Sequence, residues 1–317
     1  MKVLFIGSNR IGDAVLSTGL VDYLGRNNPS ARITIVCGPD AVNIFEAAPQ
    51  VERIIPMAKL RWSAHWLGLW IETVGHFWDL VVDLRASALG WCVPTRARRI
   101  MSVSAEPVHR LVSLAKVLQL DQPLPPCVWT TTRHHEVANN LIAEGGPVLA
   151  IGPTANWVGK QWRPERFAEL IGQLTSPKGI LPAARVAVFG AADERKFSAI
   201  TIDSIPASRR IDLVGRVDLL TAASCIERCS LYIGNDSGLM HLAAATGTPT
   251  LGLFGPSREC HYAPWGEKTA FVRTALRYEE LVDVPGYDHR RQETLMDSLT
   301  VESVEEAAIA LWRRIEL

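Results

Sequence analysis

Residues 3–7 read Val-Leu-Phe-Ile-Gly, and residues 148–152 repeat this pattern as Val-Leu-Ala-Ile-Gly. Each run has four apolar residues followed by a glycine, which is typical of a buried strand that ends in a tight turn. Around both runs, short apolar segments alternate with longer segments of helical periodicity. This alternation is typical of βαβ units and a parallel sheet, so the repeat predicts two α/β domains.

A break in composition separates the two halves. Residues 121–135 contain three prolines and three consecutive threonines, which interrupt the alternation. Strands are expected at 3–6, 33–37, 53–55 and 80–84, then at 148–151, 185–189, 211–214, 231–233 and 250–254. Helices are expected near 14–26, 63–76 and 108–119, then near 164–174, 193–201, 218–229, 237–246 and 301–315. We therefore predict two Rossmann-like domains, residues 1–145 and 146–317, with the last helix on either of them.

The composition argues against several classes of protein. The chain has 317 residues, 48% of them hydrophobic, and 33 Lys and Arg balance 33 Asp and Glu, which argues against a dedicated nucleic-acid-binding protein. Four apolar residues after Lys2 are too few for a secretory signal, and no stretch has the roughly 18 uninterrupted apolar residues of a membrane span. The six cysteines form no CxxC pair. We expect a cytoplasmic protein with reduced thiols.

The loop after the first strand holds a carboxylate at the start of a helix. Its glycines, Gly7 and Gly12, have the spacing of a phosphate-binding loop, but Asp13 stands where that loop needs a lysine. Because a carboxylate repels phosphate, nucleotide binding here is disfavoured. Facing a cleft, Asp13 suits a general base that accepts a proton from a hydroxyl group. The alternative is that Asp13 only caps the helix.

The loop after the second repeat carries hydrogen-bond donors. Thr154, Asn156 and Lys160 supply hydroxyl, amide and ammonium groups before a helix that Pro164 opens. Such donors suit phosphate oxygens. The alternative for Lys160 is a solvated surface lysine.

The most specific local pattern lies at residues 232–241, Tyr-Ile-Gly-Asn-Asp-Ser-Gly-Leu-Met-His. A strand ends in small polar residues and a helix begins, whose free N–H groups and positive dipole end suit a diphosphate. Ser237 and His241 are four residues apart and share a helix face. A histidine among apolar residues is often a hydrogen-bonded core residue, but one turn from this predicted site His241 is favoured as a ligand.

Together, these motifs resemble a known family over nearly the whole chain. The family is that of the ADP-heptose:lipopolysaccharide heptosyltransferases, glycosyltransferase family nine, which are inverting enzymes with the GT-B fold. The resemblance implies two Rossmann-like domains whose parallel sheets face a central cleft. The motifs that carry it are Gly12-Asp13, Lys160-Gln161-Trp162 before Pro164, Phe189-Gly190 with Glu194, Asn235-Asp236-Ser237-Gly238 with His241, and Phe254-Gly255-Pro256-Ser257.

The resemblance also implies residue roles. The residue that matches Asp13 activates the acceptor hydroxyl, Lys160 matches a contact to the donor phosphates, Glu194 one to the ribose, and Val217 one to the adenine. The donor-binding turn is matched by Asp236, Ser237, Gly238 and His241, and Thr154 and Asn156 stand near the family's hydroxyl residues. The implied donor is ADP-heptose, and the implied acceptor is the lipopolysaccharide core or a related lipid-linked or oligosaccharide glycan.

Inverting sugar transfer needs a base for the acceptor and positive charge for the departing diphosphate. Asp13 in one domain, and Lys160 with the helix after Ser237 in the other, divide these tasks. Asp79 and Asp83 are four residues apart and form no DxD triplet. We therefore expect neither a metal ion nor a cofactor.

Two features of the first domain suit peripheral contact with the inner face of the membrane. Trp62, Trp66 and Trp70 recur every four residues on a predicted helix, and residues 85–116 carry six basic residues against Glu106. The alternatives are a core face for the tryptophans and a solvated face for the basic run.

Two other functions remain open. A GT-B-like sugar-nucleotide epimerase would use the same cleft without a glycan acceptor. A catalytically silent binding protein is the other alternative, although it would have no chemical reason to combine Asp13, Lys160, Glu194 and His241. A Rossmann dehydrogenase is disfavoured, since neither first strand is followed by the dinucleotide fingerprint.

Overall fold

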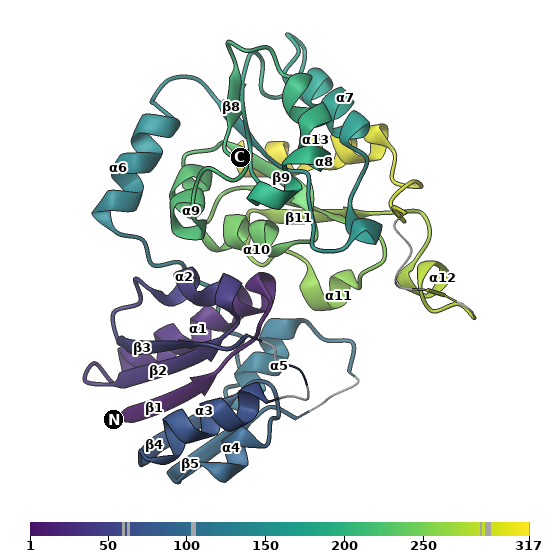
Figure 1. Ribbon diagram of the computed structural model, residues 1–317. Helices are drawn as coiled ribbons and strands as arrows, with labels where there is room; N and C mark the ends of the chain where they lie inside the picture. The colour runs from purple at the N-terminus through teal and green to yellow at the C-terminus, as the bar shows by residue number, and fades with distance from the viewer. Residues whose placement is uncertain (59–60, 62–63, 103–105, 286, 289–292, 317) are drawn as a thin grey trace. The chain divides into compact units, whose positions relative to one another are not determined.

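The computed structural model describes residues 1–316 apart from 59–60, 62–63, 103–105, 286 and 289–292. The chain forms two compact units, Met1–Trp129 and Thr130–Leu317, and each contains one parallel sheet with its helices (Figure 1). The predicted architecture of two α/β domains is confirmed. The division lies before helix α6 (Thr132–Leu141), whereas the predicted boundary at residue 145 lies after it.

Helix α6 belongs to the second unit because of its packing. It lies against helix α9 (Leu219–Glu227), and Ala138 and Ile142 are buried in the core of that unit. After α6 the chain passes through Gly145 and Gly146, whose φ angles of 116° and 47° are accessible to glycine. The predicted break at residues 121–135 overlaps the start of this helix, because its first turn consists of threonine, arginine and histidines.

The first sheet has five strands in the order β3-β2-β1-β4-β5, and all neighbours are parallel. The strands are β1 (Lys2–Ile6), β2 (Arg32–Cys37), β3 (Val51–Pro56), β4 (Trp78–Asp83) and β5 (Thr95–Ile100). Strand β5 was not expected, because Arg96, Arg98 and Arg99 interrupt its apolar pattern. It can carry them because it is an edge strand that is only partly buried.

Helix α1 covers much of the first core. Residues 14–21 are buried without a break, and the segment before the second unit crosses this helix. There the Thr18 hydroxyl accepts a hydrogen bond from the Cys127 amide at 2.9 Å, and a β-carbon at Gly19 would lie 2.5 Å from the Pro125 carbonyl oxygen. The helices of this unit are α1 (Ile11–Asn27), α2 (Val42–Phe45), α3 (His65–Val74), α4 (Leu89–Cys92) and α5 (Arg110–Val117).

The second sheet has six parallel strands in the order β11-β10-β9-β6-β7-β8. They are β6 (Val148–Gly152), β7 (Arg185–Val188), β8 (Arg210–Asp212), β9 (Leu231–Asn235), β10 (Thr250–Phe254) and β11 (Thr269–Arg273). The last, β11, is an unexpected edge strand. The other helices are α7 (Pro164–Leu174), α8 (Arg195–Asp203), α10 (Gly238–Ala245), α11 (Glu259–Tyr262), α12 (Tyr278–Leu281) and α13 (Val301–Glu316).

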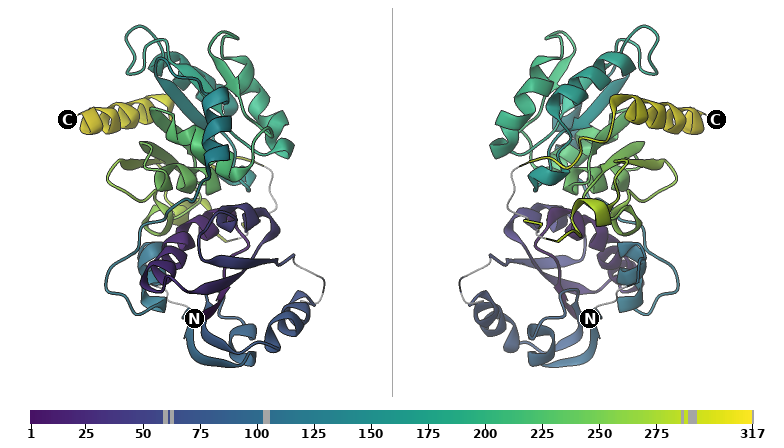
Figure 2. Two further views of the ribbon diagram at one scale, coloured as in Figure 1. Left: turned by 90° about the vertical axis from the view of Figure 1, so that its left-hand side faces the viewer. Right: turned by 90° about the vertical axis from the view of Figure 1, so that its right-hand side faces the viewer.

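Two apolar layers enclose the second sheet. One includes residues of α7, α8 and α13, and the other includes residues of α6, α9 and α10. The C-terminal helix α13, yellow in Figure 2, packs against α7 and β11, so it belongs to the second unit. The sequence pattern had left that choice open.

Each sheet has one point where the strand order reverses. In the first sheet the chain runs from β1 to β3 on one side and then crosses to β4 and β5 on the other. In the second sheet it runs from β6 to β8 before crossing to β9. In open α/β sheets, ligands bind beyond the carboxyl ends of the strands at such switch points.

Candidate functional site

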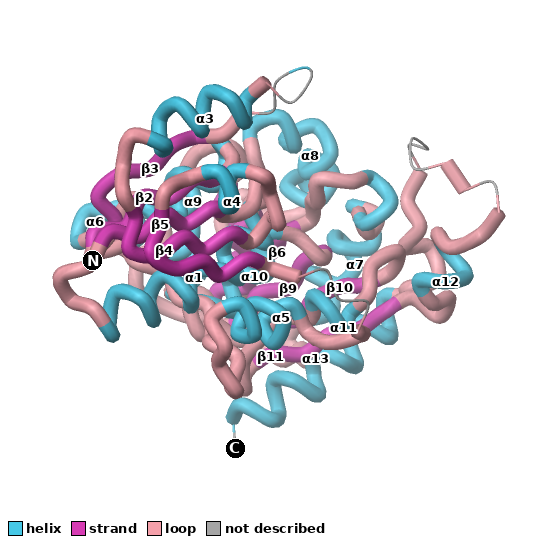
Figure 3. Tube along the Cα trace, turned by 90° about the horizontal axis from the view of Figure 1, so that it is seen from below, coloured by secondary structure: helices cyan, strands magenta, loops and turns pink. Residues whose placement is uncertain are grey.

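The switch point of the second sheet brings two of the predicted loops together. Strands β6 and β9 are neighbours (Figure 3), and their ends are in register, with Gly152 paired with Gly234. The loop from Thr154 to Lys160 follows one strand, and the turn at Asp236 and Ser237 follows the other. These donors, far apart in the sequence, therefore lie at one edge of the sheet.

Lys160 is paired at this edge. Its Nζ lies 2.5 Å from Oδ2 of Asp236, whose side chain is 5% exposed. The other carboxylate oxygen of Asp236 lies 3.9 Å from Nε2 of His241, which is buried as well. Lys160 is thus not a free surface lysine, and His241 is both buried and part of the site.

Buried amide groups fix the loop that carries Lys160. The side chain of Asn235 accepts a hydrogen bond from the Trp162 amide at 3.1 Å and donates one to the Pro153 carbonyl at 2.7 Å. Gln161 donates to the Ala155 carbonyl at 2.7 Å. Trp162 itself is fully buried. Both ends of the loop are therefore tied to the core, while its middle carries the donors.

Thr154 and Glu194 meet beside this loop. The Thr154 hydroxyl donates to Oε2 of Glu194 at 2.7 Å, and the Ala191 amide donates to the same oxygen at 2.7 Å. Gly190 gives the carboxylate room, because a β-carbon there would lie 3.2 Å from this oxygen. The structure thus brings the predicted ribose contact next to a predicted phosphate contact.

The predicted diphosphate turn has the expected form. Ser237 is the N-cap residue of α10, which Gly238 opens, and the Ser237 side chain makes no capping hydrogen bond. Its Oγ is buried and has no hydrogen-bond partner among the described residues. This hydroxyl and the first amides of the helix are available to an anion.

Two of the predicted site residues, Asn156 and Val217, make no direct contact with the Lys160–Asp236 pair in the described part of the chain. Asn156 is exposed on the loop, and Val217 is half-buried against the core layer that contains α9 and α10. The Val217 loop approaches the others at Gly215, whose amide donates to the Gly190 carbonyl at 2.9 Å. No contact joins Asn156 or Val217 directly to Lys160, Asp236 or Ser237 among those that the structure gives.

Tyr232 was not predicted as a site residue, and it lies directly beneath the two loops. Its side chain is fully buried, and its hydroxyl fills the space left by the two terminal glycines of β6 and β9. A β-carbon would lie 2.0 Å from the Tyr232 oxygen at Gly152 and 2.6 Å at Gly234. No local pattern singles it out, because the place of its hydroxyl depends on glycines from two separate strands.

We expect Gly152→Ala to lower the free energy of unfolding by about 1–3 kcal/mol, the usual cost of overpacking a core. The new methyl group would overlap the Tyr232 hydroxyl, and the buried ring cannot swing into solvent. Urea denaturation measures the difference. Gly172→Ala is the matched control, because nothing lies within 4 Å of its β-carbon, and alanine there should stabilise α7. Equal stability of the two variants would contradict the expectation.

Asp13 lies at the switch point of the first sheet, in the first turn of α1. The N-cap residue is Arg10, so the alternative that Asp13 caps the helix is wrong. The side chain is 15% exposed, with Oδ2 at 3.4 Å from the Ser8 hydroxyl and Oδ1 at 3.8 Å from Nε of Arg110. Oδ1 accepts no hydrogen bond within the described part of the chain. Although Oδ1 itself is buried, the side chain as a whole is partly accessible, and a partly accessible carboxylate is suited to proton transfer.

The surroundings of Asp13 are basic. Arg110, predicted only as part of the basic run, comes from the start of α5. Arg85 follows β4 and donates to the Asn9 side chain at 2.7 Å. Asp83, fully buried, accepts from the Arg85 amide and from Ser87, so it holds the loop after β4. Positive charge near Asp13 would attract an anionic acceptor.

Of the three tryptophans predicted to lie on one helix face, the two that the structure describes do not share one environment. Trp62 lies outside the described residues, Trp66 packs against the core of the first unit, and Trp70 is 38% exposed. The Trp66 ring also lies under the Arg85 guanidinium, 5.3 Å away. The core interpretation therefore holds for Trp66 but not for Trp70.

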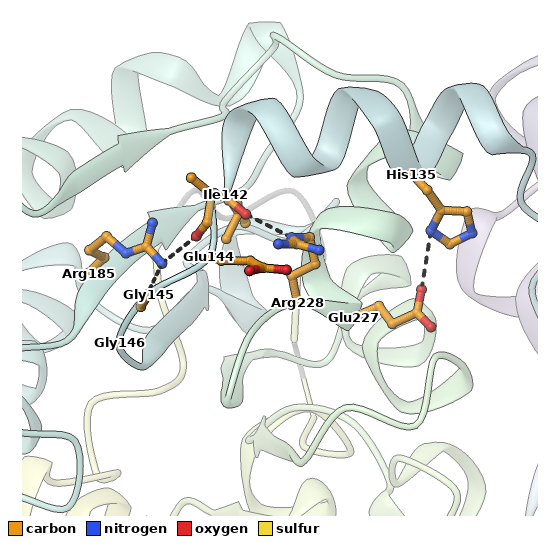
Figure 4. Close-up of a pocket in the computed structure, with 9 residues that line it drawn as sticks. His135, Ile142, Glu144, Gly145, Gly146, Arg185, Glu227 and Arg228 are labelled. Carbon is orange, nitrogen blue, oxygen red and sulfur yellow. Dashed lines mark hydrogen bonds and ion pairs between the residues drawn. The ribbon is translucent and has the colours of Figure 1, made fainter.

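A pocket of about 430 Å³ lies elsewhere, at the beginning of strands β6 and β7 (Figure 4). Arg185 donates to the Ala143 carbonyl at 2.7 Å and to the Gly145 carbonyl, and Arg228 donates to the Ile142 carbonyl at 2.7 Å. Both guanidinium groups thus hold the segment after α6. This pocket is at the opposite edge of the sheet from the switch point.

In the described part of the chain, no group of three or more His, Cys, Asp or Glu side chains is placed to hold a metal ion. No helix in it is long and apolar enough to cross a membrane.

Two parallel sheets with polar loops at their switch points define an α/β protein of the GT-B class. The chain belongs to glycosyltransferase family 9 (heptosyltransferase), whose family model matches residues 82–284. The predicted resemblance is therefore confirmed.

Individual members of the family are similar to this chain over most of their length. The chain is 26% identical to lipopolysaccharide heptosyltransferase 2 of Salmonella typhimurium, over 89% of this chain and 90% of that one. The structure of Escherichia coli ADP-heptose lps heptosyltransferase II has a TM-score of 0.75 and 22% identity, with full coverage of both chains. The glycosyl transferase family 9 structure from Veillonella parvula has a TM-score of 0.81 and 19% identity, covering 98% and 97%. These structures support the fold.

Proposed function

We propose that this protein is an inverting heptosyltransferase that uses ADP-heptose and acts on a lipopolysaccharide-core or related cell-surface glycan. The observation that carries the proposal is the Lys160–Asp236 pair beside the start of α10, at the switch point of a family nine chain. The names of relatives support the choice of sugar, since they include ADP-heptose and lipopolysaccharide.

On the donor side, the second unit supplies the leaving-group site. Lys160 has further N–H groups beyond the one directed to Asp236, and these would bind phosphate oxygens. The Ser237 hydroxyl and the first amides of α10 would bind the same diphosphate. Glu194 would accept a hydrogen bond from the ribose, Val217 would lie against the base, and Thr154 and Asn156 would complete the polar rim. Charge that develops on the departing ADP is stabilised by these donors.

On the acceptor side, Asp13 would act as the general base. The Asp13 carboxylate would accept the proton of the attacking hydroxyl as the new glycosidic bond forms and the bond to the ADP oxygen breaks. Arg110, whose Nε lies 3.8 Å from Oδ1, places positive charge beside this carboxylate. The anomeric configuration inverts because attack and departure occur on opposite sides of the same carbon.

The proposal is tested by a panel of ADP-, UDP-, GDP- and TDP-linked sugars. A thermal shift selective for ADP-heptose, followed by sugar transfer to delipidated or intact lipopolysaccharide core, is the expected result. Incubation with the donor alone distinguishes an epimerase, which would convert it without an acceptor. A chain that binds no sugar nucleotide would contradict the transferase and favour the silent binding protein.

Transfer should persist in excess EDTA, because Lys160 and the start of α10 are proposed to supply the positive charge that a metal ion supplies in other transferases. The measurement is the rate of ADP release with EDTA and then with added Mg²⁺. A rate lost in EDTA and restored by Mg²⁺ would overturn this part of the proposal.

We also propose that the enzyme contacts the membrane through an apolar surface of the first unit. Leu67, Trp70 and Ile71 lie on one face of α3, and Trp91 lies on the neighbouring α4; we call these four residues the α3–α4 patch. Leu67, Ile71 and Trp91 are each more than 60% exposed. The Trp70 indole donates to the Cys92 carbonyl at 3.2 Å, which joins the two helices.

The charge beside the α3–α4 patch is positive. Strand β5, next to α4 in Figures 1 and 3, carries Arg96, Arg98 and Arg99, and Arg98 donates to the Gly90 carbonyl at 3.0 Å. Apolar and aromatic side chains next to arginines suit an anionic lipid surface.

The double variant Ile71→Ser/Trp91→Ser should therefore bind phosphatidylglycerol vesicles at least about tenfold more weakly, because it loses two large apolar side chains from the patch. Vesicle co-sedimentation measures the binding, with phosphatidylcholine vesicles as the uncharged comparison. Ile200→Ser, on the exposed face of α8, is the control variant. Equal binding by wild type and the double variant would reject this surface.

A further inference from the structure

Tyr232 offers a polar group to the donor site from below, although its ring belongs to the core. Its side chain is fully buried among the residues that line the α9 and α10 side of the sheet. Its oxygen lies at the ends of β6 and β9, next to Gly152 and Gly234. A phenylalanine would fill the same space without a polar atom, so the hydroxyl itself calls for an explanation.

The hydroxyl groups of Tyr232 and Ser237 are not satisfied by hydrogen bonds with the described residues of the free protein. Among the described residues, neither the Tyr232 oxygen nor the Ser237 oxygen has a partner that meets hydrogen-bond geometry, and both atoms are buried. Buried polar atoms are normally satisfied, and an unpaired one lowers stability. A pair of them at the end of a strand and the start of a helix points to a ligand that completes the network.

The Tyr232 phenol keeps its proton and can donate a hydrogen bond. Burial raises the pKa of Tyr232 above its ordinary value, while the neighbouring Ser237 hydroxyl lowers it and the Glu194 carboxylate raises it further. The phenol is therefore protonated near neutral pH. The same contacts place Ser237 within reach of the phenol.

We infer that Tyr232 is a positioning residue for the donor diphosphate and acts through Ser237. This inference rests on the proposed function. In the complex the Tyr232 hydroxyl donates to Oγ of Ser237, which leaves the Ser237 proton directed to a phosphate oxygen of the nucleoside diphosphate. The two glycines make this possible, because a β-carbon at either would displace the hydroxyl. Tyr232 does not touch the reacting atoms.

The test is a double-mutant cycle with ADP as the probe, measured by isothermal titration calorimetry. Tyr232→Phe should raise the Kd for ADP about 3–10-fold, the range of one neutral hydrogen bond. Ser237→Ala should raise it at least as much. In the Ser237→Ala background, Tyr232→Phe should have no further effect. The melting temperature of free Tyr232→Phe should be no lower than that of wild type, since its hydroxyl has no partner there.

The control is Ser224→Ala, which removes another buried hydroxyl without a partner, on α9 of the same unit. It should leave the Kd for ADP unchanged. An unchanged Kd in Tyr232→Phe would overturn the inference, and so would effects of the two substitutions that simply add. A wild-type protein that binds no ADP would instead contradict the proposed donor itself, so the two failures are distinguishable.

Discussion

Asp13→Asn should lose about 10²–10⁴-fold in the rate of sugar transfer, the usual contribution of a general base, while its affinity for ADP stays that of wild type. The amide has nearly the shape of the carboxylate and can keep the contact to the Ser8 hydroxyl. It cannot accept the acceptor's proton. Because Asp13 lies in the first unit and the proposed ADP-binding groups lie in the second, chemistry and nucleotide binding should separate cleanly.

Single-turnover transfer at saturating donor is the measurement, with calorimetry for ADP. Asp22→Asn is the matched control, because Asp22 lies on the same helix and forms a helical ion pair with Arg26 at 2.8 Å. It should retain the wild-type rate. Turnover of Asp13→Asn within a fewfold of wild type would reject Asp13 as the base, and parallel loss of ADP affinity would show an indirect effect.

Lys160→Met should weaken ADP binding by about 10–100-fold, as expected for a charge-assisted hydrogen bond to phosphate. The substitution also removes the partner of the buried Asp236 carboxylate. We therefore expect lower stability of the free protein, by about 1–3 kcal/mol. These two effects have different origins and can be measured apart.

The double variant Lys160→Met/Asp236→Asn separates them. It removes the unpaired negative charge and should recover stability to chemical denaturation, but ADP binding should remain weak because the cation is still missing. Lys178→Met, at an exposed position in the same unit, is the control and should bind ADP normally. Recovery of ADP affinity in the double variant would mean that Lys160 serves only to neutralise Asp236.

Much of the fold could be predicted because the central strands are apolar on both faces. β1 and β6 are buried along almost their whole length, and their sequences repeat one another. The edge strands β5 and β11 escaped prediction for the opposite reason. They are only partly buried, so arginines and threonine are tolerated and the apolar pattern weakens.

In the candidate site, too, some features could be predicted from the sequence and others could not. Glu194 was predicted only through the family resemblance, whereas Lys160, Asp236 and Ser237 were predicted from local patterns, because loops after strands and at helix starts have recognisable compositions. Their pairing was not predictable, since it depends on the strand order that makes β6 and β9 neighbours. Tyr232 was missed because only the opposed glycines of two separate strands reveal where its hydroxyl lies.

The packing of helix α6 also determines which fragments of the protein keep an intact core. A fragment that starts at residue 146 would remove Ala138 and Ile142 from the layer over α9, and would expose apolar side chains that this layer normally covers. It would also strip Arg185 and Arg228 of the carbonyl oxygens that they hold. A fragment that starts at Thr130 keeps these contacts. Limited proteolysis that isolates the second unit should therefore cleave ahead of α6, and a soluble half-protein for crystallisation should retain this helix.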